Sequence, residues 1–133
     1  MKLSHKHSPY SEIFGHASDF KVRYEFYTES EGGRQNLPHQ GIRSDFWYEH
    51  ENHDSNSDYM IYPEFLNSDG ELINSGEVLP TGVATMWILN PEWRKYHQKR
   101  IEVGTIGFFK EGSRRTAKCE IIEIIGLHTN PVD

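Results

Sequence analysis

Short segments of the chain alternate between apolar and polar residues, the pattern of strands that turn one face towards a core. The clearest segment is Phe20–Phe26, where an aromatic or aliphatic side chain stands at every second position. Turns rich in glycine, proline and asparagine separate it from further predicted strands at 42–48, 59–62, 83–89, 101–109 and 117–125. Segment 83–89 is apolar on both faces, which predicts that another element covers it.

Two other segments do not follow this period. Residues 1–18 are polar and predict a loosely held N-terminal arm. Asn90-Pro91-Glu92 is a good helix start, since asparagine caps helices and proline is favoured at the first position. The prediction is therefore an all-β fold: a single antiparallel β-barrel of about six strands over 19–133, with at most a short helix near 91–99.

Composition narrows the class of protein. The 133 residues suffice for one domain, and 13% of them are aromatic. The lone Cys119 allows no internal disulfide, and no apolar run approaches the roughly 20 residues of a membrane span, so a cytoplasmic location is expected. The net charge of −6 argues against a general affinity for phosphate backbones.

The stretch from Glu31 to Tyr48 resembles the C-terminal β-barrel domain of elongation factor Tu. That domain has an EGGR turn, a spacer, and then glycine and arginine before an aromatic strand; here the turn at 31–34 is intact and Gly41 and Arg43 follow. A second match is the hairpin Phe109–Arg114, where Ser113 replaces a glycine of the family. The resemblance covers roughly residues 20–126.

The resemblance implies a free-standing copy of a barrel that has no catalytic role in the full factor and contacts transfer RNA and partner proteins there. The nucleotide-binding domain is not part of the match, and no phosphate-binding loop of the G-x-x-x-x-G-K-[ST] type occurs in the chain. The chain is therefore predicted to be no enzyme and to bind neither GTP nor another cofactor.

Two groups of residues are candidates for binding a partner. The first lies in the loop from Glu31 to Arg43 and includes Arg34; the alternative is that these side chains only hold the turn. The second is the segment from Trp93 to Arg100, which also contains Arg94 and joins positive charge to an aromatic ring, as RNA-binding surfaces do. Its alternative is a solvated helix whose tryptophan packs on the barrel.

Sequence motifs for a metal site or a catalytic residue are weaker than those for partner binding. Asp54-x-Asn56-x-Asp58 begins like a calcium loop, but Tyr59 stands where that loop needs glycine, so no metal site is predicted. Cys119 lies between Lys118 and Glu120 on a predicted strand and is expected to be a packed side chain rather than a nucleophile.

Three functions follow from these features. The first is a non-enzymatic module that binds a protein, which the acidic balance favours. The second is an RNA-binding module that contacts transfer RNA or the ribosome, which the arginines favour. The third is an immunity or antitoxin-like protein that mimics the barrel of the factor.

Overall fold

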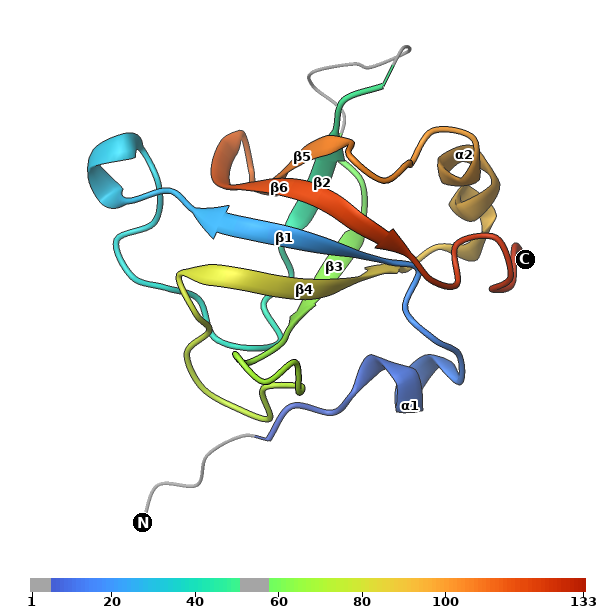
Figure 1. Ribbon diagram of the computed structural model, residues 1–133, viewed down its shortest axis with the longest axis horizontal. Coiled ribbons are helices and arrows are strands. Elements are labelled where there is room, and N and C mark those ends of the chain that lie inside the picture. The colour runs from blue at the N-terminus through green and yellow to red at the C-terminus, as the bar shows by residue number, and fades with distance from the viewer. Residues whose placement is uncertain (1–5, 51–57) are drawn as a thin grey trace.

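The described residues of the computed structural model, 6–50 and 58–133, form a curled antiparallel sheet around one core (Figure 1). The sheet has six strands in the order β2-β5-β6-β1-β4-β3. In chain order the strands are β1 (Phe20–Phe26), β2 (Asp45–Tyr48), β3 (Ile61–Phe65), β4 (Thr81–Ile88), β5 (Ile106–Glu111) and β6 (Arg114–Ile124). The prediction of a mainly β, antiparallel fold is confirmed.

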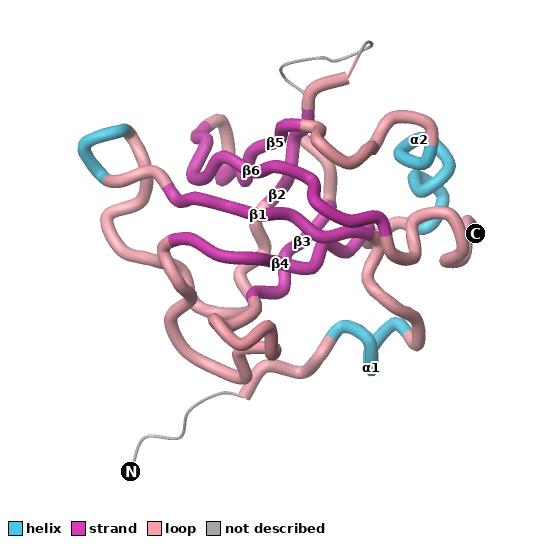
Figure 2. The backbone as a smooth tube through the Cα atoms, in the orientation of Figure 1, coloured by secondary structure: helices cyan, strands magenta, loops and turns pink. Residues whose placement is uncertain are grey.

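The helices are short and lie outside the sheet (Figure 2). They are α1 (Tyr10–Phe14), the 3-10 turns η1 (Glu29–Glu31) and η2 (Pro91–Trp93), and α2 (Arg94–Gln98). The predicted helix near 91–99 is confirmed, and the Asn90 side chain caps it by accepting a hydrogen bond from the Glu92 backbone N–H at 3.0 Å. Helix α1 lies in the N-terminal arm, where no helix was predicted.

The curl brings the two ends of the sheet together. Strands β2 and β3 stand at opposite ends of the strand order. Nevertheless Phe46 of β2 and Tyr59, just before β3, exchange both backbone hydrogen bonds, at 3.0 and 2.9 Å. Because a pair of this kind is one rung of an antiparallel ladder, it ties the two edges to each other.

The core follows from the alternation in β1. Phe20, Val22 and Tyr24 are buried, with at most 1% of each side chain exposed, whereas the intervening residues point outward. Facing them across the core, Phe109 of β5 contacts the rings of Tyr24 and Phe46 at centroid distances of 5.9 and 6.2 Å. Aromatic side chains thus fill the curled sheet in few positions.

Only β1 has the predicted bounds, and two of the other differences have a clear cause. The strand predicted over 101–109 begins only at Ile106, because Gly104 (φ +94°) turns the chain and donates its N–H to Ile121. Pro63 was predicted to end its strand, but it lies inside β3, opposite Met86. The edge position of β3 permits this, since proline needs no partner on the open side.

The N-terminal arm packs against the sheet from residue 6 onwards, so the prediction of a loosely held arm is wrong for this part. The His7 side chain and the Tyr10 backbone N–H both bond to the Glu64 carboxylate of β3. The rings of Tyr10 and Phe14 lie 5.7 and 6.1 Å from that of Trp87 on the outer face of β4. The arm is thus the cover that the two apolar faces of segment 83–89 predicted (Figure 1).

Candidate functional site

The two predicted groups of binding residues lie at opposite ends of β1 and do not form one surface (Figure 1). The residue before β1, Asp19, bonds to Arg94 of α2. The far end of β1, at Phe26, leads instead into η1 and the loop that contains Arg34. Each group is therefore considered by itself.

Glu31 and Arg34 hold the loop in which they stand. The Glu31 carboxylate accepts hydrogen bonds from the backbone N–H and the hydroxyl of Thr28, at 2.8 and 2.9 Å, which closes a capping box on η1. The bond from the Thr28 N–H is the main reason that the pKa of Glu31 is lowered. Arg34 forms an ion pair with Glu111 of β5. This is the arrangement of the alternative in which the side chains hold the turn.

The two glycines of the EGGR turn are needed for different reasons. Gly32 has φ +94°, in the left-handed region that side-chain-bearing residues avoid. Gly33 has ordinary dihedrals, but a Cβ there would stand 2.1 Å from the backbone oxygen of Tyr27. The first glycine gives the turn its direction, and the second lets two backbone segments approach each other.

Arg43 lies apart from this turn, towards the N-terminal arm. Its charge acts on Tyr10 and opposes the rise in that residue's pKa, which burial causes. The neighbouring Gly41 stands against the His7 ring, since a Cβ on it would lie 3.3 Å from Nδ1. Arg43 itself is exposed and makes no hydrogen bond to another described residue.

Arg94 is not a surface residue, and its predicted role in binding a partner is wrong. Only 1% of the residue is exposed. Its Nε donates to Asp19 at 2.7 Å, and Nη2 donates to the Ile88 carbonyl at 3.1 Å. Asp19 also accepts from the Ile88 backbone N–H and from Asn130. Arg94 therefore fastens α2 to β1, β4 and the C-terminal segment.

Trp93 and Arg100, the other predicted members of this group, are accessible to different degrees. Trp93 is 49% exposed and packs its ring edge against Tyr96, with centroids 5.3 Å apart. The guanidinium of Arg100 lies over the Tyr96 ring, 3.7 Å from its centroid, and Nη1 donates to the Tyr96 carbonyl. Arg100 is thus largely occupied within the protein, and Trp93 is the member with the freest surface.

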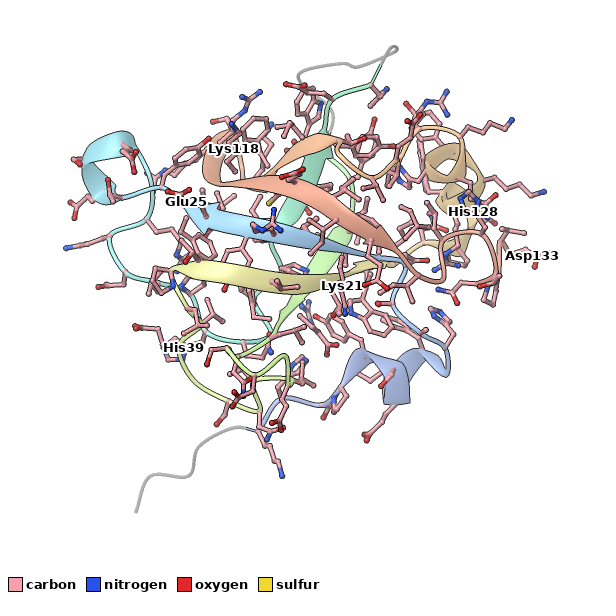
Figure 3. All side chains as sticks on the ribbon, viewed as in Figure 1. Lys21, Glu25, His39, Lys118, His128 and Asp133 are labelled. Atoms are coloured by element: carbon pink, nitrogen blue, oxygen red, sulfur yellow. The ribbon has the colours of Figure 1, made fainter. Side chains whose placement is uncertain are left out.

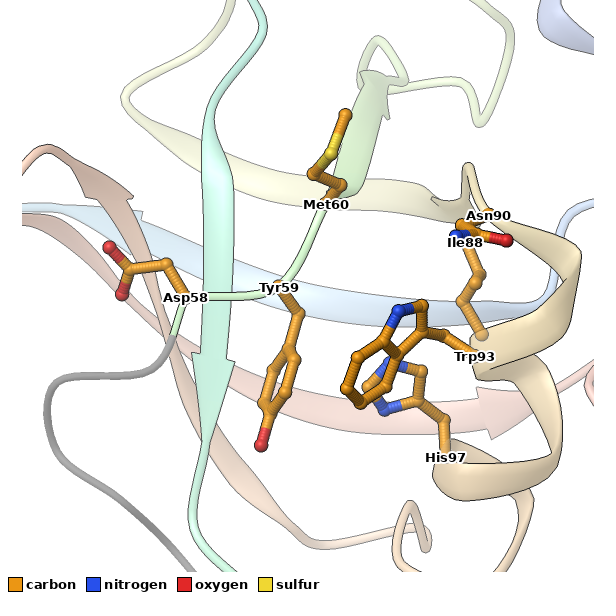
Figure 4. A pocket seen from close by; sticks show the side chains of 7 residues that line it. All are labelled: Asp58, Tyr59, Met60, Ile88, Asn90, Trp93 and His97. Carbon is orange, nitrogen blue, oxygen red and sulfur yellow. The ribbon is translucent and has the colours of Figure 1, made fainter.

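Beside Trp93 the structure forms a pocket of about 270 Å³ (Figure 4). Side chains from α2, from η2, from the end of β4 and from the segment before β3 surround it. The lining residues are Asp58, Tyr59, Met60, Ile88, Asn90, Trp93 and His97. Met60, like Trp93, is a large apolar side chain at the surface, with 56% exposed. Three of the seven lining residues thus carry aromatic rings, and two of the seven, Trp93 and Met60, are large exposed apolar side chains.

His97 forms one wall of the pocket as a neutral ring. It is 1% exposed, and its Nδ1 lies 2.7 Å from the Tyr48 hydroxyl. The pKa of His97 is lowered to about 3, mainly by burial and also by the charges of His50, Arg100 and Arg94. Burial also raises the pKa of Tyr48, so this hydroxyl keeps its proton and can donate it to Nδ1. The wall carries no charge at neutral pH.

The depressed pKa of His97 predicts a pH-dependent stability. An unfolded histidine takes up its proton near pH 6.5 and the folded one only near pH 3, so stability is lost as pH falls between these values. Between pH 7 and pH 5 the wild type is expected to lose about 2 kcal/mol more than His97→Gln. Urea unfolding at the two pH values measures the difference. An equal loss in both proteins would contradict the predicted protonation state.

The opposite side of the pocket carries one carboxylate, that of Asp58. Asp58 forms an ion pair with Lys110 of β5, with 2.7 Å between Oδ1 and Nζ. Asp45 belongs to the same group: burial raises its pKa, and the charge of Asp58 raises it further. Asp58 is the carboxylate in the pocket lining, and the positive charge of Arg100 acts on His97 in the other wall.

Sequence reasoning missed Tyr59, Met60 and His97 as candidates. One available signal was the spacing of Trp93 and His97, since residues four apart share one face of a helix. No such local signal connects Tyr59 or Met60 to that helix, because the pairing of Tyr59 with Phe46 is a tertiary contact.

The outer face of the sheet carries a second basic area, on β6. Arg114, Arg115 and Lys118 are exposed, and Arg115 lies 4.0 Å above the Phe108 ring. Lys118 stands opposite Glu25 of β1, so the positive charges alternate with acidic ones (Figure 3). The area is mixed in charge rather than a continuous basic patch.

Other chemistry has little support in the part of the chain that the structure describes. Cys119 is buried, and burial raises the pKa of its thiol, which disfavours the reactive thiolate. Residues 6–50 and 58–133 contain no group of three side chains arranged to hold a metal ion. Most of the calcium-like segment, up to residue 57, lies outside the described residues. Among the described helices, none has the length and apolar character needed to cross a membrane.

Comparison with known proteins assigns the chain to no group. No protein-family model matches it, and a search of curated proteins finds no match.

Proposed function

We propose that this protein is a non-enzymatic binding module that recognises a protein partner through the surface around Trp93. The observation that carries the proposal is the aromatic pocket, with two large exposed apolar side chains, Trp93 and Met60, beside it. Tryptophan is enriched among residues that dominate binding energy, and methionine adapts to varied partners. A pocket beside such residues receives an anchoring side chain of the partner.

The titratable groups at the pocket support binding rather than catalysis. A general base works best with a pKa near the operating pH, but that of His97 is lowered to about 3. Tyr48, its hydrogen-bonded partner, has a raised pKa and so yields its proton less readily. Both groups hold the wall of the pocket and offer no activated nucleophile.

The proposal includes the fold relationship indicated by the sequence. We infer that the curled sheet is a β-barrel of the kind found at the C-terminal end of elongation factor Tu. The bridge between Phe46 and Tyr59, which ties the sheet edges, supports closure. The glycine requirements at Gly32 and Gly33 support the EGGR turn as a structural element. Contacts of the factor are not carried over to this chain by a shared fold.

RNA binding is the second candidate, because Arg114, Arg115 and Lys118 are exposed on β6. The alternation with Glu25 and the net charge of −6 weaken the field that would attract a polyanion. An immunity or antitoxin-like role, the third function considered, rests on the net charge and the proposed barrel fold alone.

Capture from native lysate separates these functions. The wild type and Trp93→Ala are used as baits at low salt and at about 0.5 M salt, where exposed charges are strongly screened. A protein retained by the wild type at both salt concentrations and reduced at least tenfold with Trp93→Ala is the expected result. The loss corresponds to about 1.4 kcal/mol, a modest value for a central tryptophan.

The controls test the other surfaces. Arg34→Ala/Arg43→Ala changes the loop predicted from the sequence, and Arg114→Ala/Arg115→Ala changes the basic area of β6. Both are expected to keep the protein partner. Transfer RNA released by salt and lost with the β6 variant would contradict the proposal in favour of RNA binding, and a captured toxin would indicate the immunity role.

A further inference from the structure

The pocket beside Trp93 has the size of one side chain rather than of a whole ligand. Its volume of about 270 Å³ lies just below the range of about 300–1,000 Å³ that is usual for sites of drug-sized molecules. It opens beside Trp93 and Met60, two exposed apolar side chains on which neighbouring parts of a partner can lie. An occupant delivered by a partner chain therefore fits better than a free small molecule.

The rings present π faces in several directions. The planes of Tyr59 and Trp93 are inclined by 51° with centroids 6.4 Å apart, and the His97 ring is nearly perpendicular to that of Tyr59, at 82° (Figure 4). The Tyr59 and Trp93 rings are close enough to pack on each other, so an occupant lies against the accessible side of this ring cluster, where a cation within about 6 Å of a centroid is attracted to the ring. Inclined aromatic walls of this kind suit a rounded group better than a flat one.

Charge favours a cation as the occupant. The His97 ring is neutral at neutral pH, although the positive charge of Arg100, which lies over the Tyr96 ring, acts on it. Asp58 lines the pocket and places a carboxylate there, in an ion pair with Lys110. The whole-protein charge of −6 acts in the same direction.

A methylated lysine fits this pocket lining better than an unmodified lysine does, because it needs fewer hydrogen-bond acceptors. An unmodified ammonium is strongly hydrated and needs acceptors for three hydrogen bonds. Here the Asp58 oxygen that faces Lys110 is engaged, and the Asn90 oxygen accepts from the Glu92 N–H. Methyl groups keep the charge and remove the need for acceptors, so apolar contact and cation–π attraction act together.

We propose that the pocket formed by Tyr59, Trp93, His97 and Asp58 takes the methylated ammonium group of a lysine side chain on the partner protein. This inference rests on the proposed function of the same surface as a protein-binding site. It specifies the chemical group that the pocket selects.

Calorimetric titration with short capped peptides tests the inference. One peptide carries trimethyllysine, a second carries lysine, and a third carries the neutral tert-butyl isostere of trimethyllysine. The trimethylated peptide is expected to bind at least about fivefold more tightly than either of the others. Equal binding of the isostere would overturn the inference, because shape and apolar area would then explain the whole affinity.

Two variants of the protein sharpen the test. Trp93→Leu keeps an apolar side chain but removes the π face, and Lys95→Leu makes a change to leucine at an exposed position of α2. Trp93→Leu is expected to remove the preference for the charged peptide while the urea midpoint stays unchanged, and Lys95→Leu to retain it. Preference retained in Trp93→Leu would overturn the role given to the ring.

Free choline identifies the source of the group. Weaker binding of choline than of the trimethylated peptide supports a protein-borne lysine, whereas binding of choline as tight as that of the peptide overturns it. If no trimethylated probe binds but Trp93-dependent capture of a protein persists, the inference is wrong and the binding function stands. If no trimethylated probe binds and no protein is captured through Trp93, both the inference and the proposed binding function are wrong.

Discussion

Replacing Arg94 by methionine is expected to lower the free energy of unfolding by about 3–5 kcal/mol, the cost of leaving one member of a buried ion pair without its partner. Arg94 is 1% exposed and Asp19 is fully buried, so water cannot replace the lost contact. Asp19 would keep its bonds from the Ile88 N–H and from Asn130, but it would lose the neighbouring positive charge. Urea unfolding followed by far-UV circular dichroism measures the loss.

Lys95→Met is the matched control for this substitution. It removes a positive charge from the adjacent position of the same helix, but Lys95 is exposed and forms no ion pair with another described residue. Its effect is expected to stay within about 0.5 kcal/mol. A loss of similar size in both variants would show that net charge, and not the buried pair with Asp19, sets the stability of this end of the fold.

Truncation of Phe109 to alanine is expected to destabilise the protein by about 3–5 kcal/mol, the range measured for large core aromatics. Phe109 is fully buried, and its ring lies 5.9 Å from those of Tyr24 and Phe65. The strands on both sides of β5 hold its backbone through ladder hydrogen bonds, so the sheet cannot collapse to fill the cavity. The midpoint of urea unfolding gives the effect.

A surface truncation and a milder core substitution complete this test. Val103→Ala removes apolar atoms from a side chain that is 63% exposed and is expected to change stability by less than about 0.5 kcal/mol. Phe109→Leu keeps most of the apolar volume and should lie between the two alanine variants. A loss at Phe109→Ala no larger than that at Val103→Ala would contradict the position of this ring in the centre of the core.

Local patterns were sufficient wherever the physical cause is local. The period of two places Phe20, Val22 and Tyr24 on one face of β1, since alternate side chains of a strand point the same way. The capped start at Asn90-Pro91 determines where the short helix begins, because both preferences concern the backbone of that turn. The same holds for the left-handed Gly32 in the EGGR turn.

The candidate site was only partly accessible to such reasoning. Trp93 was singled out as a candidate for binding a partner, and it is 49% exposed. Arg94, one position further, was assigned to the same surface but points inward, because the charge that neutralises it lies 75 positions away in sequence at Asp19. The charge of an arginine and the residues next to it in sequence do not show which distant carboxylate it will pair with.

The sequence by itself determined the strand-rich class, the short helix after Asn90 and the core face of β1, because each depends on residues that are close along the chain. The tertiary structure alone decided the rest: the docking of the N-terminal arm on Glu64 and Trp87, and the pocket that unites Tyr59 with α2. These contacts depend on how a curled sheet brings distant segments together, and loop closure of this kind leaves no local periodic pattern.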